Sequence, residues 1–150
     1  MPIVLFFLSY TKKFFIKYPP QSNERVVTFV STNQVSESSN QTMAQYGKSK
    51  TKEKHPIINT ALFVDEKTNI SIYYEHFEGS VLDKSQTPYT LEKCKNLGYE
   101  KLFLMMDRGY YSFKNLDKMD NHGFGFVVMI PDTVGIIESL INLYRNKIKL

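Results

Sequence analysis

A short apolar run ends in three residues that could do chemistry, because Asp107, Arg108 and Gly109 follow residues 101–106 directly. So dense an apolar run, closed by a turn signal, is typical of a strand buried on both faces of an α/β sheet. Ligands of such sheets sit beyond the carboxyl ends of the strands. There Asp107 could hold a divalent cation, Arg108 could reach a phosphate, and Gly109 would let the backbone turn tightly. The alternative is a plain turn, because Asp at the end of a strand is also common turn chemistry.

A second chemical signal is an alternation of lysines in the middle of the chain. An extended backbone would project alternate side chains to one side, where a row of lysines could follow phosphates. The alternative is a solvated connecting loop, which is the usual behaviour of charged tracts. The three histidines share no spacing that would predict a metal site. The alternating lysines are Lys48, Lys50, Lys52 and Lys54.

These residues need a sheet to bring them together. Residues rich in β-branched and aromatic side chains predict a first strand over 25–32, followed by a polar loop over 34–54. Two further strands are expected over 57–64 and 70–77. The polar turn between them predicts that they pair antiparallel.

Helices are expected to alternate with the later strands. Thr87 as N-cap and Pro88 in the first turn predict a helix that ends at Gly98. The strand that ends at Asp107 comes next, and a fifth strand is expected over 124–130.

Two more helices are predicted after Asp107. The first covers residues 112–119 and is expected to turn Phe113, Leu116 and Met119 to one buried side. The second follows Pro131, where apolar residues recur at the spacing of an amphipathic helix.

This order of elements predicts an α/β fold of the ribonuclease H-like type. Such a fold has a mixed sheet of three antiparallel strands followed by two parallel strands, with flanking helices, and we expect it to be incomplete in this chain. The first and fourth strands are neighbours in that layout, so their ends at Val30 and Asp107 would meet. We expect residues 1–24 to be the remnant of a preceding element and residues 25–150 to be the partial domain.

Length and composition narrow the class of protein. A chain of 150 residues fits one domain, and its net charge of +4 permits nucleic acid as a partner without requiring it. The single cysteine, Cys94, excludes an internal disulfide and a cysteine-based zinc site. The apolar start is too short for a signal peptide or a membrane span. We therefore expect a cytoplasmic protein with no membrane partner.

Three blocks of sequence resemble insertion-sequence DDE transposases. The similarity runs from about Arg25 to Ile130, and the order and spacing of the blocks make it specific. The blocks are Ser31-Thr32-Asn33 with Gly47-Lys48-Ser49-Lys50, then Phe77-Glu78-Gly79-Ser80-Val81-Leu82-Asp83, then Asp107-Arg108-Gly109-Tyr110-Tyr111-Ser112 with Asn115-Leu116.

The resemblance implies metal-dependent cleavage and transfer of DNA strands, with Mg²⁺ or Mn²⁺ held by two Asp and one Glu. The family's second catalytic Asp matches Asp107, which would be both catalytic residue and metal ligand. The position of the family's first catalytic Asp is occupied by Val30 in this sequence. The third acid, a Glu on a later helix, has only Glu138 as a candidate, with a solvent-facing helix residue as the alternative. Asp83 matches a recurrent position that we expect to support the ligands or a turn.

The aromatic pair in the third block offers two interpretations. Tyr110 and Tyr111 could stack on an exposed base or pack on the following helix. Packing is the interpretation we favour.

The departure at Val30 decides the predicted function. Replacing a metal-bridging Asp by Val removes two ligand oxygens and a charge, so Mg²⁺ would not stay bound in working geometry. We therefore predict a truncated transposase fragment of DNA transposition that is catalytically impaired, so whether it is an enzyme stays open. Its expected partners are the DNA of the element ends and a further copy or a full-length transposase. The predicted DNA-binding residues are Lys48, Lys50, Lys52 and Arg108.

Two alternatives remain open. The chain could be a non-catalytic DNA-binding or transposition-inhibiting protein that keeps the lysine row and the core. It could also be a residual nuclease that uses Asp107 with Asp65, Asp83 or Glu138 in place of the missing acids.

Overall fold

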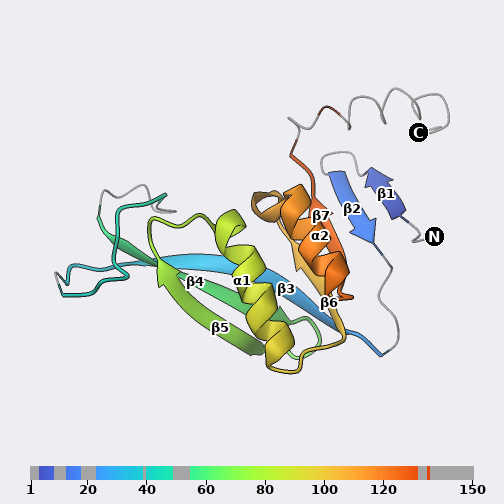
Figure 1. Ribbon diagram of the computed structural model, residues 1–150, viewed down its shortest axis with the longest axis horizontal. Coiled ribbons are helices and arrows are strands. Elements are labelled where there is room, and N and C mark those ends of the chain that lie inside the picture. Colours follow the sequence, from blue (N-terminus) through green and yellow to red (C-terminus); the bar gives the residue numbers. More distant parts are fainter. Residues whose placement is uncertain are drawn as a thin grey trace.

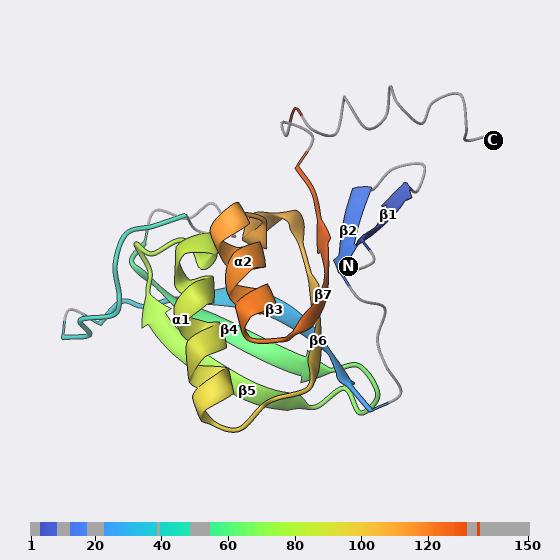
Figure 2. The same ribbon diagram turned by 45° about the vertical axis from the view of Figure 1, so that its right-hand side comes forward.

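The computed structural model describes residues 4–8, 13–17, 23–38, 40–48, 55–131 and 135. Their strands form one mixed sheet in the order β1-β2-β7-β6-β3-β4-β5. Helices α1 and α2 lie on the same face of that sheet (Figures 1 and 2). The elements are β1 Val4–Leu8, β2 Lys13–Lys17, β3 Arg25–Val35, β4 Ile57–Asp65, β5 Ser71–Glu78, α1 Asp83–Asn96, β6 Leu102–Met106, the 3₁₀ turn η1 Arg108–Tyr110, α2 Phe113–Asn121 and β7 Gly125–Met129.

Strands β3, β4 and β5 form the antiparallel unit that the sequence predicts. Alternate residues of β3, such as Val27 and Phe29, are buried beneath the helices, as the two-residue period of a strand requires. The turn between β4 and β5 follows Asp65 and contains Asn69 with φ of 56°. Strand β3 is longer than predicted, because its pairing with β4 continues to Val35.

The last two strands of the domain are parallel to β3. Strand β6 pairs parallel with β3, and β7 pairs parallel with β6. Helix α1 connects β5 to β6, and α2 connects β6 to β7. The predicted ribonuclease H-like arrangement, with three antiparallel strands followed by two parallel strands, is confirmed.

Helix α1 begins earlier than the sequence signals predict. It starts at Asp83, with Leu82 as an N-cap that makes no side-chain hydrogen bond, so the predicted N-cap Thr87 lies inside the helix. Pro88 has no N–H to donate to the Lys84 carbonyl one turn back. It is tolerated there because the side-chain amide of Asn115 donates to that carbonyl instead. The predicted end is confirmed, since Gly98 follows the helix with φ of 89°.

Helix α2 begins where the sequence predicts and ends two residues later, at Asn121, but one residue of its predicted buried side is wrong. Ser112 caps the helix, and its Oγ accepts a hydrogen bond from the backbone N–H of Asn115 at 3.1 Å. Met119 is fully buried and Leu116 packs against the core. Phe113 instead has 73% of its surface exposed.

Strands β1 and β2 continue the same sheet. They pair antiparallel with each other, and β2 pairs antiparallel with β7 in a register that runs from Phe14 beside Met129 to Lys17 beside Phe126. The boundary at residue 24 stays a prediction. The amphipathic helix predicted after Pro131 lies outside the described residues apart from Gly135. Within the described part of the chain, no helix has the length and apolar character to cross a membrane.

Candidate functional site

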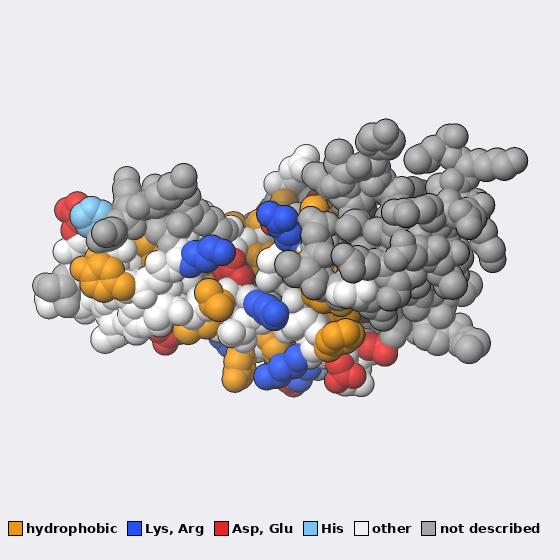
Figure 3. All heavy atoms as spheres, turned by 90° about the horizontal axis from the view of Figure 1, so that it is seen from above, with side chains coloured by type: hydrophobic (Ala, Val, Ile, Leu, Met, Phe, Trp, Pro, Cys, Tyr) orange, Lys and Arg blue, Asp and Glu red, His pale blue; other side chains and the backbone are white. Residues whose placement is uncertain are grey.

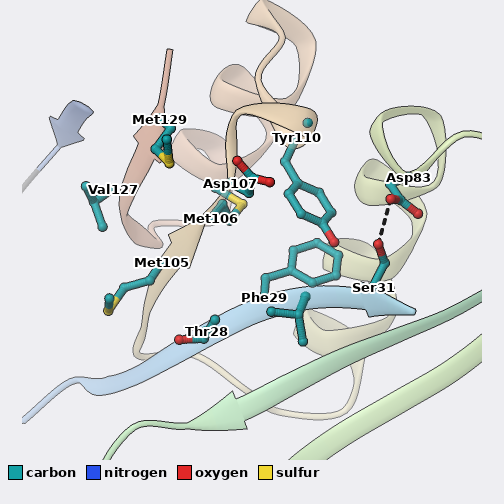
Figure 4. Close-up of a pocket in the computed structure, with 12 residues that line it drawn as sticks. Thr28, Phe29, Ser31, Asp83, Met105, Met106, Asp107, Tyr110, Val127 and Met129 are labelled. Carbon is teal, nitrogen blue, oxygen red and sulfur yellow. Dashed lines mark hydrogen bonds between the residues drawn. The ribbon is translucent and has the colours of Figure 1, made fainter. Parts of the chain in front are cut away.

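Asp107 lies directly beyond the last residue of β6. Four of the five residues of β6 are buried, whereas Asp107 is exposed. Its carboxylate accepts a hydrogen bond from the backbone N–H of Arg108 and so begins η1. Asp107 therefore serves the turn, as the alternative interpretation expected, and still presents its carboxylate beside Met106 and Tyr110 (Figure 4).

Val30 occupies the position on β3 that corresponds to Asp107. The parallel register pairs Phe29 with Met106, the last residue of β6, so Val30 and Asp107 are the next residues on the two neighbouring chains. Phe29 packs beneath the helices, and alternation turns Val30 to the opposite face of the sheet, where it is 37% exposed. An Asp at residue 30 would therefore place a carboxylate on the strand next to Asp107.

A second carboxylate comes from the first residue of α1. Asp83 Oδ2 accepts a hydrogen bond of 2.6 Å from Oγ of Ser31, which follows Val30 on β3 (Figure 4). The bond joins the start of α1 to the strand that carries residue 30. Asp83 thus supports the strand next to the site, in keeping with the supporting position predicted for it.

These residues surround a cavity of about 380 Å³. Most of its lining is apolar, so water would be partly excluded from a ligand held there. Figure 4 shows Asp107 and Asp83 on two sides of it, with Tyr110 between them. The lining residues are Thr28, Phe29, Val30, Ser31, Asp83, Met105, Met106, Asp107, Gly109, Tyr110, Val127 and Met129.

Tyr110 separates the two carboxylates. Only 5% of its surface is exposed, and its ring centroid lies 4.6 Å from that of Phe29. Burial raises the pKa of the Tyr110 phenol, and the negative charges of Asp83 and Asp107 raise it further. The phenol is therefore neutral at physiological pH. Tyr111 also packs against the core, so the packing interpretation of both tyrosines is confirmed.

The sequence matches the family described as Transposase DDE domain over residues 17–149. This chain belongs to the transposase DDE domain family. The solved structure titled "Mos1 transposase paired-end complex with left transposon end" is similar at 12% identity and a TM-score of 0.46, covering 69% of this chain and 34% of that chain. The present chain thus spans about a third of the length of that transposase chain. No curated protein matches the sequence.

Two sequence blocks of this DDE domain meet in space. Gly47 packs so closely on Gly79 that a Cβ at Gly47 would lie 1.8 Å from the Gly79 carbonyl oxygen. The Gly79 N–H donates to the Met43 carbonyl at 3.1 Å, and Ser80 donates to the Gln45 side chain. Glycine is therefore needed in both blocks, because the loop before residue 48 lies so close to the turn before α1 that neither position has room for a Cβ.

Asn115 of the third block joins three elements of the DDE domain. It is buried, and its Nδ2 donates to the Lys84 carbonyl of α1 at 3.1 Å and to the Tyr110 carbonyl of η1 at 2.8 Å. This bonding holds the loop after Asp107 against the start of α1. The sequence carries no local sign of the bond to α1, because Lys84 lies 31 residues before Asn115.

The described residues do not fit the two-cation site of a DDE enzyme. Asp83 and Asp107 both line the cavity, but Asp83 is bonded by Ser31, and the side chain of Val30 carries no oxygen. Across the residues that the structure describes, no three His, Cys, Asp or Glu side chains are grouped to hold a metal. Two carboxylates from different elements are fewer than a bridged pair of cations requires.

Asp65 does not replace the missing acid. Asp65 pairs with Val27, near the start of β3 and three residues before Val30. Its carboxylate accepts from the backbone N–H groups of Lys67 and Thr68, both at 2.9 Å, and forms an ion pair with Arg25 at 3.2 Å. The Thr68 backbone hydrogen bond is the main cause that lowers the pKa of Asp65. Glu138 lies outside the described residues.

The predicted DNA-binding residues are placed in part. Lys48 and Arg108 are exposed, Lys48 next to Gly47 in the loop against Gly79 and Arg108 in η1. The other members of the lysine row, Lys50, Lys52 and Lys54, lie outside the described residues.

Proposed function

We propose that this DDE domain belongs to a DNA transposition system and is impaired in metal-dependent strand cleavage. The observation that carries the proposal is the register of β3 and β6, which sets Val30 beside Asp107. In the family an Asp stands at this place, and the resemblance assigns it the first metal ligand. Asp107 would be the remaining catalytic residue.

The impairment follows from coordination chemistry. Two cations about 4 Å apart activate the attacking oxygen and stabilise the leaving oxygen of a phosphodiester. Their bridging ligand must supply oxygen atoms and negative charge, and the methyl groups of Val30 supply neither. The cavity beside Asp107 is lined mainly by apolar residues, and the hydroxyl that follows residue 30, that of Ser31, is bonded to Asp83.

DNA would be held by cations near the same edge of the sheet. Lys48 and Arg108 are exposed and free to approach phosphates, and by sequence Lys50 and Lys52 continue the row from Lys48. The proposed ligand is the DNA of the element ends. A further copy of this chain or a complete transposase is the proposed protein partner.

Nicking of supercoiled DNA in the presence of Mn²⁺ tests the impairment. We expect no cleavage by the unmodified chain and measurable cleavage after Val30→Asp. The matched control is Asp107→Ala, alone and combined with Val30→Asp, which should remain inactive. Circular dichroism and thermal unfolding establish that each variant is folded. Cleavage by the unmodified chain that disappears in Asp107→Ala would instead identify a residual nuclease, with Asp83 as the nearest second acid.

A second candidate function is a non-catalytic DNA-binding or transposition-inhibiting protein. It is favoured by the contrast between the lost carboxylate at Val30 and the retained hydrogen bonds of Asp83 and Asn115, which keep the surrounding framework in place. Co-expression with a complete, active transposase tests it. A fall in transposition that persists with Asp107→Ala would support inhibition, and unchanged transposition would exclude it.

A further inference from the structure

Phe113 is exposed where a hydrophobic side chain has no structural use. It is the first residue of α2, and 73% of its surface is accessible, although it lies only six residues before the fully buried Met119. A single exposed apolar side chain is ordinary on protein surfaces. The position of this one, six residues after Asp107, and its surroundings are what make it informative.

A second ring supports Phe113 from one side. The ring centroids of Tyr111 and Phe113 lie 6.1 Å apart with an angle of 59° between the planes. Tyr111 in turn packs against the core. The Phe113 ring is thus placed by a neighbour that is itself held in position, which lowers the entropy lost when a flat ligand lies against it.

Exposed cations lie on each of the three elements that Asn115 joins at the start of α2. Lys84 at the start of α1, Arg108 in η1 and Lys114 in α2 are all exposed. Asn115 holds the backbone of α1 and η1 against α2, because its amide bonds the carbonyls of Lys84 and Tyr110. Figure 3 looks onto the end of the molecule where α1 and α2 begin, and there Lys and Arg side chains lie among exposed hydrophobic side chains.

Three acidic groups lie on the same elements, and each accepts a hydrogen bond. Asp83 is bonded to Ser31, and Asp107 lies at the cavity and bonds the backbone of Arg108 (Figure 4). Asp117 lies one turn further along α2, where its Oδ2 accepts from Asn121 at 3.1 Å. The surface around Phe113 therefore carries charges of both signs, with the cation of Lys114 next to Phe113 in the sequence and that of Arg108 in the turn before α2.

We propose that Phe113 is a stacking platform for an unpaired DNA base, with Arg108 and Lys114 holding the flanking phosphates. An aromatic face among cations is the chemistry that binds single-stranded nucleic acid without sequence preference, because every base has a π-face and every nucleotide a phosphate. The inference deepens the proposed function and rests on its DNA binding. It identifies the substrate form as a strand with an unpaired base close to Asp107.

The test compares two DNA probes of equal charge. One is a blunt duplex, and the other has a short single-stranded overhang that carries 2-aminopurine, whose fluorescence falls when it stacks. We expect Phe113→Ala to weaken binding of the overhang by roughly 5- to 100-fold and to restore its fluorescence, with blunt duplex binding unchanged. Phe113→Trp should retain both properties of the unmodified chain.

Tyr74→Ala is the matched control, because Tyr74 is 65% exposed on β5, away from the starts of α1 and α2. It should leave both probes unaffected. Equal binding of the overhang by the unmodified chain and Phe113→Ala would overturn the inference while leaving the proposed DNA binding intact. Failure of the unmodified chain to bind either probe would overturn both. A change of sedimentation in Phe113→Ala with unchanged DNA binding would assign the ring to a protein contact and also overturn it.

Discussion

Asn115 of α2 replaces a backbone hydrogen bond that α1 cannot make for itself. Its Nδ2 lies 3.1 Å from the carbonyl oxygen of Lys84. In an uninterrupted helix that carbonyl would accept from the N–H four residues later, but the residue there is Pro88, which has no N–H. The same amide donates to the Tyr110 carbonyl. One side chain therefore fixes the start of α1 against the loop that carries Asp107.

Removing this amide should destabilise the fold measurably. We expect Asn115→Ala to lower the free energy of unfolding by about 1 to 3 kcal/mol, because the buried bond to Tyr110 and the half-buried bond to Lys84 are both lost. Urea unfolding followed by circular dichroism measures the difference. Asn121→Ala on the same helix is the control, since Asn121 is exposed and bonds only Asp117 at the surface, and it should change stability by less than about 0.5 kcal/mol. Equal losses in the two variants would contradict the role of Asn115.

The glycine-to-glycine contact between two sequence blocks gives a second prediction. A Cβ at Gly79 would lie 2.0 Å from the Ile57 carbonyl oxygen, so Gly79→Ala must displace backbone. We expect a loss of about 1 to 3 kcal/mol in the free energy of unfolding, the usual cost of overpacking. Gly109→Ala is the control because a Cβ there meets nothing within 4 Å. Thermal unfolding of both variants measures the difference. A Gly79→Ala variant as stable as Gly109→Ala would show that the loop moves to accept the methyl group without cost.

The sequence predicts the parts of this fold whose signals are local. The apolar run before Asp107 suffices for a strand, because burial on both faces leaves no other use for so many apolar residues. Gly98 and Gly123 end their helices with φ of 89° and 72°, a conformation in which glycine is the common residue. The neighbourhood of Val30 and Asp107 also follows from the order of the strands, and the register of β3 with β6 confirms it.

The features that sequence reasoning missed depend on partners far along the chain. Helix α1 starts before Thr87 because Asn115 satisfies the carbonyl that Pro88 leaves free, and nothing local announces a donor so distant. Phe113 fits the helical period of α2, yet it lies at the first turn, beyond the reach of the sheet, and is exposed. The bond from Ser31 to Asp83 likewise joins residues 52 positions apart.

Glu75 makes the stability of the domain depend on pH. Burial raises the pKa of its carboxyl, but hydrogen bonds from Lys93, Thr90 and Gln86 outweigh burial and lower the pKa below its ordinary value of 4.5. The folded form therefore binds this proton less readily than the unfolded chain does. Its stabilising contribution is complete above the unfolded pKa and is lost as the pH falls through the folded pKa.

We therefore expect the free energy of unfolding to fall with acidification below about pH 4.5. The free energy of unfolding of the Glu75→Gln variant should fall less steeply over the same pH range, because a glutamine side chain does not titrate. Urea unfolding at a series of pH values measures both slopes. Asp65 and Glu92, whose pKa values are also lowered, contribute equally to the two proteins. Parallel slopes would mean that Glu75 contributes nothing to the acid loss.

Restoring a carboxylate at residue 30 should create a cation site that binding alone can detect. Val30→Asp would add a carboxylate on the strand next to Asp107, and we expect it to tighten Mn²⁺ binding about tenfold or more, measured by titration calorimetry. Val35→Asp adds the same charge at an equally exposed valine of β3, 38% against 37%, but five residues from the site, so it should leave the affinity unchanged. Val30→Asp with Asp107→Asn should lose the gain. Equal tightening by Val30→Asp and Val35→Asp would mean that charge alone, and not the register with Asp107, attracts the cation.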